Sequence, residues 1–287
     1  MYKDYFHLQC EPFNITPDPR FLYMTAQHQE ALNHLLYGIR QRKGFICLTG
    51  EVGAGKTTLC RALLAQLGAG VHTALILNPM LTGTQLLRAV LAEFGVQMKR
   101  QDRLGCLNEL NKFLLATSAA GREAVLIIDE AQDMPLETLE LTRLLSNLET
   151  DSHKLLQILL VGQPELRDRL AKPSLRQLAQ RIAVRYHLGT MSRDDTAHYI
   201  RHRLAVACEG APTATNRGGD PVPTPEGSAV QFDEDAISEI HYRARGTPRL
   251  VNSLGDKALL AGYVYQTGRI DRRLVRLAAA DLKEALA

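Results

Sequence analysis

One short stretch of the chain combines the residue types that bind phosphate. It is Gly50-Glu51-Val52-Gly53-Ala54-Gly55-Lys56-Thr57, and it matches the pattern G-x-x-x-x-G-K-[ST] at every fixed position. Glycines let the backbone turn tightly and aim its N–H groups at phosphate oxygens, and a following helix adds partial positive charge. Lys56 would reach the β- and γ-phosphates, and the Thr57 hydroxyl would reach Mg²⁺. We therefore expect this loop, with Thr58 beside it, to bind ATP and Mg²⁺.

Two carboxylates follow an apolar run later in the chain. Val125–Ile128 is apolar, and Asp129 and Glu130 come directly after it. A carboxylate at the carboxyl end of a parallel strand lies where open α/β sheets bind their ligands. We expect Asp129 to join Thr57 in holding Mg²⁺, and Glu130 to orient and polarise the attacking water. The alternative is a pair of solvated carboxylates with no catalytic role.

Strand-like and helical patterns alternate between residues 45 and 188, which predicts an α/β fold with a mostly parallel sheet covered on both faces. Unbroken apolar runs fit strands that are buried on both sides. The expected strands are Phe45–Thr49, Thr73–Asn78, Ala124–Asp129, Leu155–Val161 and Ala183–Leu188. The helical patterns between them lie near residues 56–67, 84–94, 104–118 and 135–148.

After about residue 190 we expect helices and no further strands. The helical patterns cover residues 192–208, 233–245, 247–266 and 272–286. We therefore expect residues 1–190 to form a nucleotide-binding domain, with residues 1–43 as its N-terminal lead-in, and residues 191–287 to form a small helical domain. Residues 210–229 are rich in Gly, Pro, Thr and Ala and predict a flexible loop within it.

The composition excludes several classes of protein. Of 287 residues, 45% are hydrophobic and 23% are charged, an ordinary globular mix that argues against wholesale disorder. No apolar run approaches the roughly 18–20 residues of a membrane span, and residues 1–6 do not begin a secretion signal. We therefore expect a cytoplasmic protein without an integral membrane segment. The five cysteines form no CxxC pair, which argues against a disulfide framework or a zinc site.

Charge is distributed unevenly along the chain, although the net charge is only +3. Residues 165–203 and 241–287 each carry nine basic and four acidic side chains, a net of +5. Residues 204–240 carry one basic and seven acidic side chains, a net of −6. The pattern fits an ordinary mixed surface, an anionic ligand, a nucleic-acid backbone or a neighbouring subunit.

Several further motifs occur in a specific order. The N-terminal run is Phe6-x-Leu8-x3-Pro12-Phe13-x3-Pro17-Asp18-Pro19-x-Phe21-Leu22-Tyr23, followed by His28-x-Glu30-Ala31-Leu32-x2-Leu35-x-Tyr37-Gly38-Ile39 and Gly44-Phe45. Later come Asp129-Glu130-Ala131-Gln132, Val161-Gly162-Gln163-Pro164-Glu165-Leu166, Gln180-Arg181-Ile182 and Gly246-x-Pro248-Arg249-x-x-Asn252. Over nearly the whole chain, these motifs resemble the ExeA-type family of AAA+ ATPases, which is named for general secretion pathway component A. The resemblance implies a P-loop AAA+ domain with a small C-terminal helical lid.

The resemblance also implies roles for three side chains. Gln163 matches the sensor 1 position near the γ-phosphate, with a capping or loop glutamine as the alternative. Arg249 matches the sensor 2 position in the helical domain, where a guanidinium could couple the γ-phosphate to domain closure. Arg181 matches the arginine finger, which acts on the nucleotide of a neighbouring subunit. Arg176 and Arg185 are rivals for that role.

Two further expectations concern positions near the nucleotide. Asn78, at the end of an expected strand, could be a polar switch that holds Glu130 away from water. The Pro17–Tyr23 segment could pack on the adenine, with Tyr23 or Phe21 as the apolar contact. Ordinary core packing is the alternative for that segment.

A finger that acts between subunits implies a ring or filament, and six or seven subunits are usual in this class. Longer ExeA-type proteins continue into a membrane span and a peptidoglycan-binding domain, neither of which we expect in this chain. Our first hypothesis is an oligomeric ATPase that drives or regulates assembly of a bacterial envelope machine for secretion, pili or polysaccharide export. Such a protein would be cytoplasmic or peripheral to the inner membrane. The alternatives are a regulator that binds double-stranded DNA, such as the ATPase partner of a transposase, and a nucleotide-gated adaptor with slow hydrolysis.

Overall fold

The chain forms two compact units. The computed structural model describes residues 1–14, 18–98, 100–150, 153–209 and 230–284. The sheet unit consists of residues 28–51 and 56–188, and the helical unit consists of residues 1–27, 52–55 and 189–287. The loop expected at residues 210–229 lies outside the described residues.

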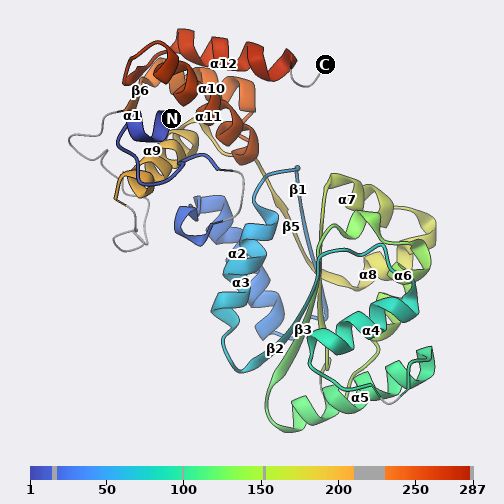
Figure 1. The fold of residues 1–287 in the computed structure, drawn as a ribbon. Helices are drawn as coiled ribbons and strands as arrows, with labels where there is room; N and C mark the ends of the chain where they lie inside the picture. Colours follow the sequence, from blue (N-terminus) through green and yellow to red (C-terminus); the bar gives the residue numbers. More distant parts are fainter. Residues whose placement is uncertain (15–17, 99, 151–152, 210–229, 285–287) are drawn as a thin grey trace. The chain divides into compact units, whose positions relative to one another are not determined.

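A five-stranded parallel sheet organises the sheet unit (Figure 1). The strands are β1 (Phe45–Gly50), β2 (Val71–Ile76), β3 (Glu123–Ile128), β4 (Gln157–Gly162) and β5 (Ile182–Leu188). Their spatial order is β2-β3-β4-β1-β5, and every neighbouring pair is parallel. The predicted parallel α/β fold is confirmed, and no strand end lies more than two residues from its expected position.

Helices cover both faces of this sheet. They are α2 (Ala26–Arg40), α3 (Lys56–Leu67), α4 (Gly83–Glu93), α5 (Arg103–Ala119), α6 (Leu136–Leu145), α7 (Pro164–Leu170) and α8 (Arg176–Arg181). In Figure 1, α2 and α3 lie on one face, and α4 and α5 lie on the other. On the α2 face, a Cβ added to Gly38 would lie 2.7 Å from Ile46 Cδ1. The missing side chain therefore lets α2 approach β1 closely.

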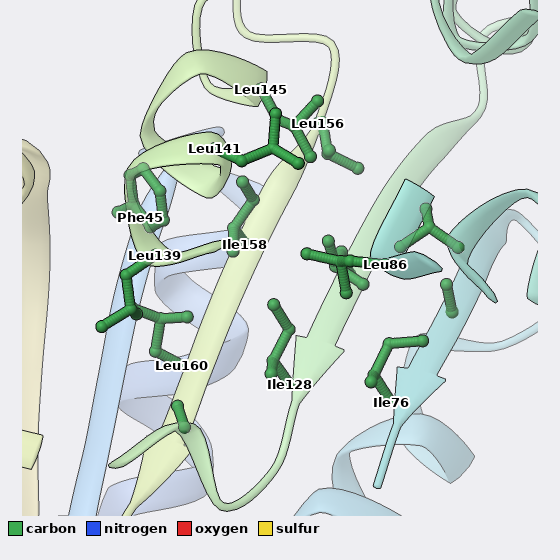
Figure 2. Packing of buried hydrophobic residues seen from close by; sticks show 14 of the residues in the cluster. Phe45, Ile76, Leu86, Ile128, Leu139, Leu141, Leu145, Leu156, Ile158 and Leu160 are labelled. Carbon is green, nitrogen blue, oxygen red and sulfur yellow. The ribbon is translucent and has the colours of Figure 1, made fainter. Parts of the chain in front are cut away.

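Successive strand residues point to opposite faces, so each strand supplies side chains to two layers of the core. Figure 2 shows the layer in which strand side chains meet leucines of α4 and α6. Its labelled members are Phe45, Ile76, Leu86, Ile128, Leu139, Leu141, Leu145, Leu156, Ile158 and Leu160. All of these side chains are buried. Burial on both faces explains why the central strands are continuously apolar in sequence.

The helical unit contains the helices that the sequence predicts after residue 190. They are α9 (Arg193–Glu209), α10 (Glu234–Ala244), α11 (Pro248–Val264) and α12 (Arg272–Glu284). The expectation that no strand follows residue 190 is wrong, because β6 (Gln231–Phe232) and β7 (Arg269–Ile270) form a short parallel pair. Each strand has only two residues, too few to produce a recognisable period, and Phe232 and Ile270 anchor them in the core.

The N-terminal segment packs within the helical unit, although we expected it to lead into the nucleotide-binding domain. It contains the short helix α1 (Tyr2–Tyr5) and a 3₁₀ turn, η1 (Pro19–Phe21). Phe6 and Phe13 are each only 1% exposed. A Cβ on Gly255 of α11 would lie 2.9 Å from the Phe13 ring, so the ring packs directly on that helix. Burial of these aromatic rings holds the segment to the helices.

The described residues also bear on two exclusions. None of their helices has both the length and the apolar character needed to cross a membrane. All five cysteines are free thiols. Burial raises the pKa of Cys47 to about 11 and that of Cys60 to about 12, so neither thiol ionises readily near neutral pH.

Candidate functional site

The phosphate-binding sequence lies between β1 and α3, as its motif requires. Gly53 has φ of +77° and Gly55 has φ of +98°, which other residues rarely adopt. Gly50, the last residue of β1, is constrained by space, because a Cβ there would lie 2.8 Å from the Leu188 carbonyl oxygen. The glycines are therefore required by backbone geometry.

Lys56, the first residue of α3, is folded back on the loop. Its Nζ donates to the carbonyl oxygens of Gly50 at 2.7 Å and Glu51 at 3.0 Å. The side chain is buried, and burial lowers the pKa of Lys56, while the nearby charges of Glu130 and Asp129 act in the opposite direction. Loop carbonyls thus hold an ammonium group where the motif places the phosphates.

Asp129 is held by neutral donors at the carboxyl end of β3. Its Oδ2 accepts a hydrogen bond from Thr57 Oγ1 at 2.8 Å, and its Oδ1 accepts one from the backbone N–H of Glu130 at 2.9 Å. The residue is 4% exposed, yet no lysine or arginine forms an ion pair with it in the described parts of the chain. A buried carboxylate that is bonded to a hydroxyl and not to a cationic side chain fits a Mg²⁺ ion.

Glu130 has an unusual backbone conformation for a residue with a side chain. Its φ is +50°, in the left-handed region. Its Oε2 accepts hydrogen bonds from Gln132 Nε2 at 2.9 Å and, at greater length, from Gln163 Nε2 at 3.4 Å. Such strain is typical of functional positions, where the surroundings hold the residue in place.

Gln163 was expected near the γ-phosphate and Asn78 near Glu130, and the structure brings Gln163 rather than Asn78 to the glutamate. Gln163 occupies the N-cap position of α7, but its side chain makes no capping bond and instead donates to Glu130. Asn78 is exposed, and its Oδ1 accepts from the Met80 backbone N–H. Within the described residues no hydrogen bond joins Asn78 to Glu130. Two glutamines, rather than the asparagine, hold the glutamate here.

The three arginines considered for the finger differ in their surroundings. Arg181, at the end of α8, donates from Nη1 to Ser146 Oγ at 2.7 Å and also to Asn147 Oδ1, just after α6. Arg185 is exposed and donates to the Ala179 carbonyl oxygen at 2.6 Å. Arg176 is exposed and has no partner among the residues described. Arg181 is therefore the most firmly positioned of the three.

The other expected nucleotide contacts belong to the helical unit. Residues 52–55 of the loop group with this unit, in which a Cβ on Gly53 would lie 2.5 Å from Arg249 Cβ. Phe21 is 7% exposed, and the Arg203 guanidinium lies 4.6 Å from its ring centroid. The ring centroid of Tyr23 lies 6.0 Å from that of Tyr199. Both aromatic side chains thus take part in the core packing of this unit.

Sequence reasoning assigned no role to Gln132 or Arg169, which the structure brings to the same site. Gln132 joins Glu130 to the end of β4, because its Oε1 accepts the Gln163 backbone N–H at 3.0 Å. Arg169 of α7 donates to the carbonyl oxygens of Gln132 and Met134. Only the position of Gln132, two residues after the glutamate, could have suggested its contact with that carboxylate.

A curated protein that is similar to this chain is about twice as long as the chain. General secretion pathway protein A of Aeromonas hydrophila is 44% identical over 284 residues, which are 98% of this chain and 48% of that protein. The chain thus spans about half the length of this curated relative. In addition, a family model described as an AAA domain matches residues 39–170.

Solved structures share the fold at low sequence identity. The ORC2 protein of Aeropyrum pernix aligns with a TM-score of 0.63 and 16% identity, over 95% of this chain and 71% of that chain. The RuvB Holliday junction branch migration motor of Thermotoga maritima aligns with a TM-score of 0.55 and 19% identity, over 88% and 69%. At such identities the likeness shows the fold alone.

Proposed function

We propose that this chain, which is similar to general secretion pathway protein A along almost its whole length and matches an AAA domain over residues 39–170, hydrolyses ATP with Mg²⁺. The observation that carries this proposal is the contact of Thr57 Oγ1 with the buried Asp129 carboxylate, which forms no ion pair within the described residues and has Glu130 beside it. These are the residues that a P-loop ATPase uses to hold its metal and to position water.

Each residue of the site has a distinct role in this proposal. The loop of residues 50–57, with Thr58, binds the phosphates through backbone N–H groups, and Lys56 turns from its loop carbonyls to the β- and γ-phosphates. Thr57 and Asp129 would hold Mg²⁺, which neutralises phosphate charge when bound. Glu130 orients and polarises the attacking water, and Gln163 is close enough to share that task. Arg249 would sense the γ-phosphate.

We further propose that the active form is a ring or filament, such as a hexamer or heptamer. In it, Arg181 would act on the nucleotide of the neighbouring subunit and stabilise charge that develops on the γ-phosphoryl oxygens. The described bonds of Arg181 all use Nη1, so its Nε and Nη2 remain available within the part of the chain described. A preorganised guanidinium of this kind suits a finger.

The biological role that we propose follows the name of the relative. The name of general secretion pathway protein A assigns that protein to a secretion pathway. By analogy, this ATPase would drive or regulate assembly of a bacterial envelope machine through contacts with its proteins, in the cytoplasm or at the inner membrane surface.

The steady-state ATPase rate, measured against protein concentration with and without Mg²⁺, tests these proposals. We expect the specific rate to rise with concentration and to need Mg²⁺. Lys56→Ala should abolish ATP binding, and Arg181→Ala should keep ATP binding but lose turnover at every concentration. Arg185→Ala serves as the matched control. Normal turnover by Arg181→Ala would disprove the role of that residue as the finger.

Nucleic-acid binding is a second candidate function, favoured by a charged cluster on the helical unit. Arg243, Arg272 and Arg276 all donate through Nε to the Glu239 carboxylate, at 2.8, 2.8 and 3.3 Å. Within the described residues the Nη groups of these arginines donate no hydrogen bond, and Arg272 and Arg276 are more than half exposed. Outward guanidinium groups in a segment of net charge +5 suit phosphate oxygens.

This second function predicts a salt-sensitive interaction with double-stranded DNA. A doubly substituted Arg272→Ala, Arg276→Ala protein should bind a DNA duplex more weakly, with a shallower dependence of affinity on salt. The matched control is Arg193→Ala with Arg269→Ala, which removes two exposed arginines that each pair with a carboxylate in the same unit. Equal losses in both proteins would indicate general charge attraction, and absence of binding by the unsubstituted protein would exclude this function.

A further inference from the structure

We propose that Gln132 is a positioning residue that fixes the Glu130 carboxylate relative to the end of β4. The inference rests on the proposed ATPase function and concerns how its water-activating residue is held. Gln132 is 8% exposed and lies in the 3₁₀ turn η2 (Ala131–Asp133), directly after Glu130.

The side-chain amide of Gln132 is fully engaged. Its Nε2 donates to Glu130 Oε2 at 2.9 Å and to Asp133 Oδ2 at 3.0 Å, which uses both of its protons. Its Oε1 accepts the backbone N–H of Gln163 at 3.0 Å. The glutamate is therefore tied, through one amide group, to the backbone at which β4 ends and α7 begins.

Two further contacts keep the side chain and the backbone of Gln132 in place. A Cβ on Gly162 would lie 2.8 Å from Gln132 Oε1, so the amide lies directly against the last residue of β4. The guanidinium of Arg169, on α7, donates to the Gln132 carbonyl oxygen and to that of Met134, the latter at 2.7 Å. Both the backbone and the side chain of Gln132 are thus fixed, which is what precise orientation of a partner requires.

The bonds to Glu130 are divided unequally between its two oxygens. Gln132 and Gln163 both donate to Oε2, and Oε1 has no partner within the described parts of the chain. A carboxylate that is held through one oxygen presents the other in a fixed direction, so Oε1 is the atom that receives the water proton. Orientation of this kind contributes to the rate without contributing to nucleotide affinity.

The substitution Gln132→Glu separates this role from a merely structural one. A glutamate at 132 still accepts the Gln163 N–H but has no proton to donate to Glu130. Two ionised carboxylates side by side also repel each other, so Glu130 loses the orientation that the amide of Gln132 gives it. Gln85→Glu is the control, since its oxygen caps α4 and a carboxylate can replace it.

We would measure kcat for the full chain, together with the Kd for ATP in the presence of Mg²⁺. The expected result for Gln132→Glu is a fall in kcat of about tenfold or more with an unchanged Kd. If Gln132→Glu does not fold, Gln132→Met, similar in shape and without hydrogen bonds, should show the same loss of kcat. A folded variant with the kcat of Gln85→Glu would overturn the inference, as would a parallel loss of kcat and affinity. Absence of turnover by the unsubstituted protein would instead overturn the proposed ATPase function, and this inference with it.

Discussion

Asp129 of the sheet unit and Glu239 of the helical unit are equally buried, each 4% exposed, and yet have opposite partners. Neutral groups, the Thr57 hydroxyl and a backbone N–H, hold the Asp129 carboxylate. Three guanidinium groups surround the Glu239 carboxylate. Burial alone would raise the pKa of Glu239, but the bonds from these arginines lower it to about 2. One carboxylate keeps its charge available, and the other has its charge neutralised.

This difference separates the proposed metal site from a carboxylate that joins two helices. A buried charge without a cationic partner is costly, so it persists where a bound cation or substrate repays the cost. Glu239 instead joins α10 to α12 through Arg272 and Arg276. The two units therefore use the same functional group for different ends, and the same amide substitution in each should have different consequences.

The largest effect is expected at Glu130, which we propose to polarise the attacking water. Glu130→Gln removes the charge of this side chain while keeping its shape, so turnover should fall by about a hundredfold or more. ATP binding and the free energy of unfolding should change little. Single-turnover hydrolysis and urea unfolding of the same preparation measure both quantities. A large fall in the free energy of unfolding of Glu130→Gln would mean that Glu130, like Glu239, mainly stabilises the fold.

The corresponding substitution in the helical unit should act on stability instead. Glu239→Gln leaves three arginines without their shared carboxylate, and the free energy of unfolding should fall by about 2 kcal/mol, the scale of hydrogen bonds to charged groups. The ATPase rate per folded molecule should remain that of the unsubstituted protein. Urea unfolding followed by circular dichroism gives the first quantity. An unchanged unfolding midpoint would show that the cluster does not stabilise the helices.

Acid should reveal the same cluster without any substitution. The pKa of Glu239 is lowered from its ordinary value of 4.5 to about 2 in the folded chain. Its contribution to stability is therefore complete above pH 4.5 and is lost as the pH falls towards 2. The free energy of unfolding should decline more steeply over this range in the unsubstituted protein than in Glu239→Gln. Parallel pH dependences in the two proteins would contradict the assignment.

The smallest effect is expected for one arginine of the cluster. Arg276 is 56% exposed and makes the longest of the three bonds to Glu239, at 3.3 Å. Arg276→Ala should lower the free energy of unfolding by less than about 1 kcal/mol, because solvent screens an exposed ion pair. Arg243→Ala, which removes a less exposed partner at 2.8 Å, should cost more. The reverse order would mean that the carboxylate depends chiefly on α12.

Much of the fold could be predicted because its signals are local. The strands of the sheet are continuous apolar runs, and α9 to α12 follow helical patterns that end within a few residues of their expected limits. Strands β6 and β7 were missed because two residues cannot establish a period. The packing of residues 1–27 in the helical unit was also missed, since Phe6 and Phe13 are apolar residues that could enter either core.

The candidate site divides in the same way. The phosphate loop was recognisable because its glycines, lysine and threonine meet backbone and charge requirements within eight consecutive residues, 50–57. The surroundings of Glu130 were not recognisable. Gln163 follows a different strand, and it meets the glutamate only because β3 and β4 are neighbours in the sheet. The sequence does not reveal this strand order, and for that reason we expected Asn78 rather than Gln163 to contact Glu130.

The amino-acid sequence by itself determined the phosphate loop, the acidic pair that follows β3 and the alternation of strands and helices. Each of these depends on residues that are close together in the chain, whose conformational preferences act before any tertiary contact forms. Only the tertiary structure decided which groups hold each buried carboxylate. Gln163 lies 33 positions from Glu130, and Arg272 lies 33 positions from Glu239. Strand order in one unit and helix packing in the other bring these partners within hydrogen-bond distance. The local periodicity of the sequence predicts neither the strand order nor the helix packing.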